Sequence, residues 1–325
     1  MSIVRRKLLA ALASVAAWPL AARAQQTGMP VVGFLSAASL EKFTPFVAGF
    51  QNGLKKAGFV EGENVAIEYR WAQGDYNRLP ALATDLARRQ VNVIAAIDGL
   101  PSILAAKAAT TTIPIVFLTA ADPIKYGLVA SFNHPGGNIT GLVVLNAELI
   151  PKRLEVMHEV MPTARTMALL VNPANPIAET LVAEALEAAR SLGVEVHILH
   201  ASTEQDLDRV FAELRESALV IGADPFFNSR SEQLAALALR RRIASIYQYR
   251  EFTAAGGLMA YGTDIYDAWS QAGNQTARIL RGDKPADLPV QQVTKVELII
   301  NLKTAQALGI TVPPTLLARA DEVIE

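Results

Sequence analysis

The chain of 325 residues contains no cysteine. This absence excludes disulfide bonds, thiolate metal sites and cysteine nucleophiles. It also excludes an anchor through a lipid-modified N-terminal cysteine, so we expect a protein that is free in its compartment and not inserted in a membrane. Histidine is scarce, with four in the chain. His197 and His200 have no third ligand close in sequence, which favours ordinary surface positions over a metal site. No metal or other cofactor is predicted.

Neither sign of charge is in excess. The 30 Lys and Arg residues nearly balance the 31 Asp and Glu residues, for a formal net charge of −1. Nucleic-acid-binding domains usually carry a basic excess, so no nucleic-acid partner is expected. The composition, 51% hydrophobic and 19% charged, is typical of globular proteins. The length allows about two domains.

Sequence motifs of several common enzyme classes are missing. The sequence contains no Gly-x-Ser-x-Gly, His-Glu-x-x-His, Walker A or Gly-x-Gly-x-x-Gly pattern. We therefore expect a protein that is not an enzyme. One enzymatic alternative stays open, because Asp224 and Asp264 could supply a carboxylate pair for acid–base chemistry.

The N-terminus has the composition of an export signal. Residues 5–7 are basic, residues 8–22 are apolar or small, and residues 22–24 read Ala-Arg-Ala, which suits a signal peptidase. The apolar stretch is short for a membrane span, which needs about 20 residues. We predict a signal peptide over residues 1–24, cleavage after Ala24 and a periplasmic protein. The arginine pair leaves both the Sec and the twin-arginine routes open.

Short apolar strands and amphipathic helices alternate beyond the signal. Residues 30–36 predict a buried strand, and the apolar spacing over residues 43–57 predicts a helix that ends at Gly58. Such alternation is typical of parallel sheets that helices cover on both faces.

The alternation restarts once, which divides the chain. One run spans residues 29–145 and a second spans residues 146–262. We predict an α/β protein with two Rossmann-like parallel-sheet lobes joined by a hinge. The tail is too small for a third lobe, so residues 263–288 are expected in the first lobe and residues 289–325 in the second.

Small, polar and aromatic residues follow the predicted strands. Ligands of parallel sheets bind beyond the carboxyl ends of the strands, often at helix N-termini. A Ser or Asp at such a place is often only a helix or turn cap, and this alternative stays open. Two adjacent aromatics are not expected to enter one core together, which favours a binding role for Phe226 and Phe227. The candidate ligand-binding residues are Ser36, Ala37, Gly99, Ser102, Thr119, Ala120, Asp122, Asn175, Asp224, Phe226, Phe227, Tyr261 and Asp264.

Several segments, taken together, resemble a known family. They include Val-Val-Gly-Phe-Leu-Ser-Ala-Ala-Ser (31–39), Gly-Phe-Val-Glu-Gly-Glu-Asn (58–64), Glu-Tyr-Arg-Trp-Ala (68–72), Pro-Gly-Gly-Asn-Ile-Thr-Gly (135–141), Ala-Asp-Pro-Phe-Phe-Asn-Ser-Arg (223–230) and Gly-Gly-Leu-Met-Ala-Tyr-Gly (256–262). From the signal to the C-terminus, the chain resembles the ABC-transporter substrate-binding proteins of the tryptophan/tyrosine-binding type. The resemblance implies a type I periplasmic binding fold, a small ligand held between the lobes, and delivery of that ligand to the membrane permease of an ABC importer.

The resemblance also implies a mechanism. We expect the lobes to close about the hinge because the ligand contacts both lobes only in the closed state. The ligand stays open between an amino acid and an aromatic or carboxylate compound. The alternative function is that of an exported sensor for a membrane receptor. The implied contacts are stacking by Phe226 or Phe227, hydrogen bonds to a carboxylate from Ser36, Ser102 and Thr119, and an amine held by Asp224 or Asp264.

Overall fold

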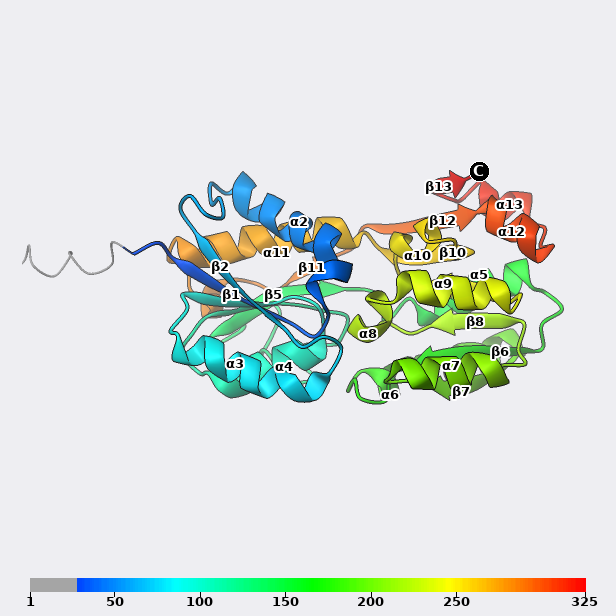
Figure 1. The fold of residues 1–325 in the computed structure, drawn as a ribbon, viewed down its shortest axis with the longest axis horizontal. Coiled ribbons are helices and arrows are strands. Elements are labelled where there is room, and N and C mark those ends of the chain that lie inside the picture. Colours follow the sequence, from blue (N-terminus) through cyan, green and yellow to red (C-terminus); the bar gives the residue numbers. More distant parts are fainter. Residues whose placement is uncertain (1–27) are drawn as a thin grey trace, which may run out of the picture.

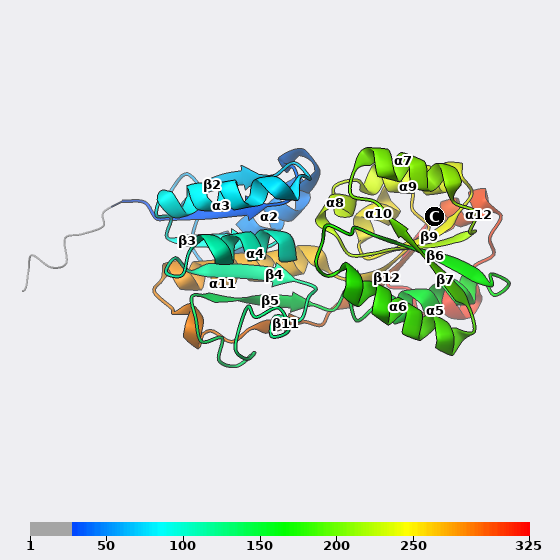
Figure 2. The same ribbon diagram turned by 90° about the horizontal axis from the view of Figure 1, so that it is seen from below.

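The computed structural model describes residues 28–325. Within this range the chain forms two α/β lobes that lie side by side along the long axis of the molecule (Figures 1 and 2). The predicted signal peptide, residues 1–24, lies outside the described residues. No helix in the described range combines the length and the apolar character needed to cross a bilayer.

The first lobe is built on a six-stranded sheet in which neighbouring strands pair in parallel. Its central strands are apolar and buried throughout, because helices cover both faces of the sheet. From one edge to the other the strands are β11 (Gln291–Val293), β5 (Ile139–Val144), β4 (Ile115–Thr119), β3 (Val93–Ala96), β1 (Val31–Ser36) and β2 (Ala66–Trp71).

The second lobe repeats this arrangement on a seven-stranded sheet. Its strands pair in parallel except for β10 and β12, which are antiparallel. The order is β13 (Glu322–Ile324), β12 (Val296–Asn301), β10 (Met259–Thr263), β9 (Ala244–Tyr247), β8 (Ala218–Ile221), β6 (Thr166–Val171) and β7 (Glu195–His200). Strand β8 therefore occupies the place in this sheet that β3 occupies in the first.

Helices cover both faces of each sheet (Figures 1 and 2). Those of the first lobe are α2 (Leu40–Lys56), the 3-10 helix η2 (Tyr76–Arg78), α3 (Leu79–Arg88), α4 (Leu100–Ala109), α11 (Ile265–Leu280) and the 3-10 helix η3 (Pro285–Asp287). Those of the second lobe are α5 (Ile150–Val160), α6 (Ala178–Leu192), α7 (Glu204–Glu213), α8 (Pro225–Asn228), α9 (Ser231–Arg240), α10 (Arg250–Ala254), α12 (Leu302–Leu308) and α13 (Pro314–Leu317).

The two lobes share the tail of the chain. Helix α11 packs on α2 in the first lobe, while β12 pairs with β10 in the second. The described chain thus crosses between the lobes after β5, after β10 and after β11 (Figure 1). These crossings form the hinge region.

One expectation about the tail needs correction. Residues from 289 onward were assigned to the second lobe, but Gln291 in β11 pairs with Leu142 in β5 of the first sheet. The last crossing therefore lies between Val293 and Val296. A strand of three residues with exposed glutamines has too few alternating positions to be recognised from periodicity.

Helices α2 and α11 pack closely because glycines lie between them. A Cβ on Gly53 would lie 1.9 Å from the carbonyl oxygen of Ser270, and a Cβ on Gly273 would lie 2.1 Å from the carbonyl oxygen of Phe50. Any side chain at these positions would push the helices apart. The packing fixes α11, which begins at a crossing, firmly to the first lobe.

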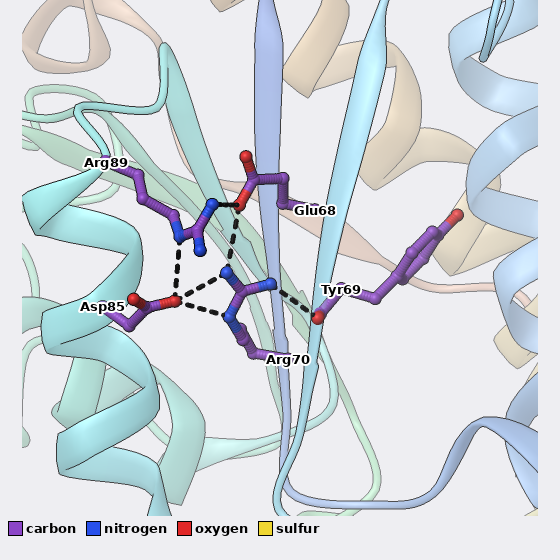
Figure 3. Close-up of polar contacts among 5 residues, drawn as sticks. All are labelled: Glu68, Tyr69, Arg70, Asp85 and Arg89. Atoms are coloured by element: carbon purple, nitrogen blue, oxygen red, sulfur yellow. Dashed lines mark hydrogen bonds and ion pairs between the residues drawn. The ribbon is translucent and has the colours of Figure 1, made fainter.

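Charged side chains protect the edge strand β2. Arg70 donates two hydrogen bonds to Asp85 of α3, at 2.6 and 2.8 Å, and also pairs with Glu68 (Figure 3). Arg89 bridges the same two carboxylates. The hydrogen bonds that Asp85 accepts from Arg70 lower the pKa of the Asp85 carboxyl group. Such a network discourages pairing of the exposed edge with another chain.

Candidate functional site

A cavity lies between the two lobes. It opens where the carboxyl ends of strands from both sheets face each other. Its lining residues are Phe43, Phe46, Ile97, Asp98, Gly99, Leu100, Leu118, Thr119, Ala120, Val144, Asn175, Ile177, Ala223, Asp224, Pro225, Asn228, Tyr249, Ile265 and Trp269.

Asp98 is the carboxylate that the first lobe contributes to the cavity. It follows β3, is only partly buried, and accepts hydrogen bonds from the Ser36 hydroxyl (2.6 Å), the Ala37 N–H (2.6 Å) and the Ser102 hydroxyl (2.5 Å). Burial raises the pKa of Asp98, and the hydroxyls of Ser102 and Ser36 oppose that shift. These hydrogen bonds hold the carboxylate at the carboxyl end of β3.

Asp224 is the corresponding carboxylate of the second lobe. It follows β8 and is 3% exposed. Its Oδ1 accepts from the Asn172 amide at 3.1 Å and from the Phe226 N–H at 2.9 Å, and its Oδ2 accepts from the Asn175 amide at 2.8 Å. Burial raises its pKa, against the effect of the two asparagines.

A tyrosine of the first lobe also reaches Asp224. The Tyr76 hydroxyl, on η2, donates to Asp224 Oδ2 at 2.9 Å across the gap between the lobes. Burial, with the neighbouring Asp224 charge, raises the pKa of Tyr76 well above its ordinary value. Tyr76 is therefore a protonated donor at any physiological pH. The lobes are in a closed arrangement in this structure.

Two further polar side chains of the cavity keep hydrogens to donate. Thr119 accepts from the Ala121 N–H at 3.0 Å through its hydroxyl oxygen, which leaves the hydroxyl hydrogen as a donor. Asn228 accepts from Gln248 at 2.5 Å through its carbonyl oxygen, which leaves its NH₂ group as a donor. Both residues line the cavity, so it offers donors as well as carboxylates.

Aromatic side chains form an apolar wall. Trp269 of α11 lies 5.9 Å from the Phe43 ring and 5.6 Å from the Phe46 ring, both on α2. Tyr249 of the second lobe approaches Phe46 at 6.4 Å, so the wall continues across the lobes. Flat apolar groups pack well against such a wall.

The cavity is anionic. Among the described residues, those that line it include Asp98 and Asp224 but no Lys, Arg or His. Two desolvated carboxylates without a cation attract a positively charged group. Among residues 28–325, no cluster of three or more His, Cys, Asp or Glu residues could hold a metal ion.

The structure places several predicted residues at the cavity and others behind it. Gly99, Thr119, Ala120, Asn175 and Asp224 line it. Ser36, Ala37 and Ser102 are fully buried behind Asp98, to which their hydroxyls or N–H donate. The expectation that the two serines donate to a ligand carboxylate is corrected accordingly, because their hydrogens are already used.

The remaining first-lobe candidate, Asp122, is exposed and caps a turn. Its Oδ1 accepts from the Ile124 N–H at 2.8 Å and the Lys125 N–H at 3.2 Å. The capping alternative describes this residue.

Phe226 and Phe227 lie away from the cavity, contrary to the stacking role expected for them. Phe227 is fully buried in the core. Phe226 lies under the guanidinium of Arg230, whose Cζ is 3.8 Å from the ring centre. Both rings nevertheless belong to one hydrophobic cluster and meet edge to face, with ring centres 5.6 Å apart. The expectation that two adjacent aromatics would not enter one core together is therefore wrong.

Tyr261 and Asp264 belong to the hinge. The Tyr261 carbonyl accepts from the buried Arg153 at 2.7 Å, and Arg153 also bonds Asn146 beside the first crossing. Asp264 caps α11 and pairs with Lys295 at 2.7 Å, next to the last crossing. The expected amine contact of Asp264 and its pairing with Asp224 for catalysis are not supported, because Asp264 is already paired at the hinge.

Sequence reasoning missed residues that complete the site. Asp98 follows the apolar run that forms β3, and this place at a strand end was a signal that could have identified it. Tyr76, Phe43 and Trp269 carry no comparable signal, because loops and helices remote in sequence bring them to the cavity.

Comparisons with known proteins fit this architecture. A family model described as ABC transporter substrate binding protein matches residues 9–324. A tyrosine-binding protein of Clostridioides difficile is 28% identical over 262 residues, which cover 80% of this chain and 75% of the relative.

Solved structures show the same fold. A conserved domain protein from Vibrio cholerae has a TM-score of 0.84 and 26% identity, covering 91% of this chain and 100% of that one. An ABC domain from Streptococcus pneumonia in complex with L-tryptophan has a TM-score of 0.81 and 24% identity, with coverage of 91% and 100%. The two lobes thus have the type I periplasmic binding fold, and the chain belongs to the family of ABC transporter substrate-binding proteins.

Proposed function

We propose that this substrate-binding protein captures a small organic ligand that carries a protonated amino group and a flat apolar group. The observation that carries the proposal is Asp98, a partly buried carboxylate at an anionic cavity with an aromatic wall. The amine would bind Asp98, and the flat group would pack against Phe43, Phe46 and Trp269.

The number of hydrogen bonds that each aspartate already accepts indicates which of the two binds the amine. A carboxylate offers about four acceptor sites. Asp98 accepts from Ser36, Ala37 and Ser102, whereas Asp224 accepts from Asn172, Asn175, Tyr76 and the N–H groups of Phe226 and Phe227. Asp98 therefore has fewer donors around it than Asp224 and is the more open of the two to an ammonium group. Asp224 adds negative charge to the cavity but has no free lone pair.

Amino acids with aromatic side chains are the first candidate ligands. The tyrosine-binding relative and the structure in complex with L-tryptophan support this choice. The Thr119 hydroxyl and the Asn228 amide can donate to the carboxylate of such a ligand. An amino acid would thus satisfy both kinds of polar group in the cavity.

The proposed role in transport depends on closure of the two lobes around the ligand. A ligand that contacts both lobes stabilises the closed state over the open one. We infer that the protein is exported by its N-terminal signal, works in the periplasm, and delivers the ligand unchanged to the permease of an ABC importer. The family membership and the composition of residues 1–24 support this role.

A ligand panel tests the proposal. The purified protein is mixed with L-tyrosine, L-tryptophan, their decarboxylated amines and their deaminated acids, and unfolding temperature and binding heat are measured. A ligand of the folded state adds about 2.7 kcal/mol of stability at a hundredfold excess over Kd. We expect the amino acids to bind, the amines to bind more weakly, and the deaminated acids not to bind. Deaminated acids that bind as well as amino acids would overturn the role of Asp98. Chromatography of the released ligand checks that it is unchanged.

A further inference from the structure

We propose that residues 73–76 form a latch between the lobes, and that Tyr76 is the positioning residue that holds the closed state through Asp224. This inference deepens the proposed function, on which its ligand-release arm rests. The latch assigns a task to the Asp224 carboxylate, whose lone pairs are used up, and to the Phe226–Arg230 pair, which lies away from the cavity.

Tyr76 bridges two lobes that the hinge can separate. Its hydroxyl donates to Asp224 Oδ2 at 2.9 Å and accepts from the Phe226 N–H at 3.3 Å. Both partners belong to the second lobe, whereas Tyr76 lies in the first. Opening the hinge must therefore break both hydrogen bonds, so they stabilise only the closed state.

In the second lobe, the side chains of Phe226 and Arg230 form the surface next to the latch. Arg230 lies on the Phe226 ring and donates to the Phe226 carbonyl at 3.2 Å, which fixes the guanidinium in place. A Cβ on Gly74 would lie 3.5 Å from that guanidinium and 3.6 Å from the Phe226 ring. Gly74, which has a left-handed conformation (φ 85°), therefore lies beside Phe226 and Arg230.

The latch is fastened to the carboxylate proposed to bind the amine. The Gly74 N–H donates to the Ala37 carbonyl at 2.7 Å, and the Ala37 N–H donates to Asp98 at 2.6 Å. Gln73 bonds the next carbonyl, that of Ala38, at 3.0 Å. Asp98 and the latch therefore form one rigid unit of the first lobe. A ligand held by Asp98 is enclosed when that unit meets Asp224.

Tyr126 provides a matched control. Its hydroxyl also crosses between the lobes, donating to the Pro176 carbonyl at 2.9 Å, but it is away from either aspartate. Tyr126→Phe removes this one interlobe hydrogen bond, whereas Tyr76→Phe removes the bond donated to Asp224 and the bond accepted from the Phe226 N–H. Only Tyr76 bonds a charged acceptor inside the cleft, so the two variants separate the latch from general lobe contact.

The first experiment measures ligand release. Trp269 lines the cavity, so its fluorescence reports binding of L-tyrosine in a stopped-flow instrument. We expect Tyr76→Phe to raise the dissociation rate about threefold to tenfold with an association rate within about twofold of wild type, and Tyr126→Phe to change both less. Equal dissociation rates in wild type and Tyr76→Phe would overturn the latch. A Tyr76→Phe variant with the wild-type circular dichroism and unfolding temperature establishes that the effect is not misfolding.

The second experiment needs no ligand, so it separates failure of the latch from failure of the proposed function. The chain has no cysteine, so Thr84→Cys and Glu187→Cys accept fluorophores on exposed positions of the two lobes. Single-molecule energy transfer then counts open and closed molecules. We expect Tyr76→Phe to lower the closed-to-open ratio about threefold to tenfold and Tyr126→Phe to lower it less. An unchanged ratio in Tyr76→Phe would overturn the proposal, whether or not L-tyrosine binds. Should Tyr76→Phe not fold, Gly74→Ala, which strains the latch backbone, is tested in the same way.

Discussion

Asp98 and Asp224 occupy equivalent places in the two lobes, since one follows β3 and the other follows β8. Their surroundings differ. Hydroxyls and one N–H hold Asp98 and leave part of it facing the cavity, while amides, an N–H and a tyrosine of the opposite lobe enclose Asp224. The topology places a carboxylate at each strand end, but the neighbours decide whether it can meet a ligand.

The difference extends to the strands beside them. Ser36 ends β1, and Asn172 follows β6, which takes the place of β1 in the second sheet. Each donates to the aspartate of its own lobe, at 2.6 and 3.1 Å. The same position thus supplies a small donor in one lobe and a bulkier amide in the other.

The largest effect should come from removing the charge of Asp98. We expect Asp98→Asn to weaken binding of an amino-acid ligand about tenfold to a hundredfold, because a buried charge-assisted hydrogen bond contributes about 1.5–3 kcal/mol. Isothermal titration calorimetry measures the change. Asp224→Asn is the matched variant, and we expect it to weaken binding less. If Asp224→Asn weakens binding more than Asp98→Asn, the proposed division of roles is wrong.

The next effect concerns stability, and here we expect Asp224→Asn to have a larger effect than Asp98→Asn. Asp224→Asn replaces one accepting oxygen by an NH₂ group that faces the donors of Asn175 or Asn172. A buried donor without an acceptor costs about 1–3 kcal/mol, so the free energy of unfolding should fall by that amount. Urea denaturation of the ligand-free protein measures it. Asp98→Asn should cost less, since the cavity admits water to that side chain, and an equal loss in both variants would argue against the comparison.

The smallest effect is a pH dependence with opposite signs for binding and stability. Burial raises the pKa of both aspartates, so each takes up a proton above the ordinary value of about 3.9. Protonated Asp98 no longer attracts an amine, so affinity falls as the pH drops through its raised pKa. In the ligand-free protein, a raised native pKa adds stability that is complete below the unfolded-state pKa and lost as the pH rises through the native one.

Titrations from about pH 8 to about pH 4 check both signs, by calorimetry for affinity and by urea for stability. These titrations are best made in a protein that carries Glu251→Gln. Burial raises the pKa of Glu251 to about 7, so this residue adds its own pH dependence of stability, with the same sign as that of the two aspartates. Affinity that stays constant down to about pH 4 would contradict an Asp98–amine contact.

The sequence predicted the lobes well because parallel strands buried on both faces are continuous apolar runs. The apolar run over residues 30–36 predicted β1, which spans Val31–Ser36. The helical spacing of residues 43–57 likewise marked most of α2, although the helix begins at Leu40. Local periodicity was sufficient for these elements because each contains enough residues to show it.

The chemistry of the site was less accessible. The sequence placed Asp224 at a strand end, but the residue that occupies its last acceptor site, Tyr76, lies 148 positions earlier. The two phenylalanines looked like ligand contacts because nothing in the local pattern revealed that both are buried in one core, with Arg230 on the Phe226 ring. Which lone pairs are free is a property of the folded surroundings.

The shared tail has a consequence for the order in which the protein can be made. When β5 has been synthesised, the first sheet still has an unpaired edge where β11 will lie, and the face that α11 covers is bare. The second sheet is incomplete until β12 and β13 have been synthesised, and these strands come after β11 in the chain. Neither lobe can therefore finish folding while the ribosome is still adding the earlier strands. Nascent chains must keep these edges and apolar faces from aggregating until α11, β11, β12 and β13 have been added.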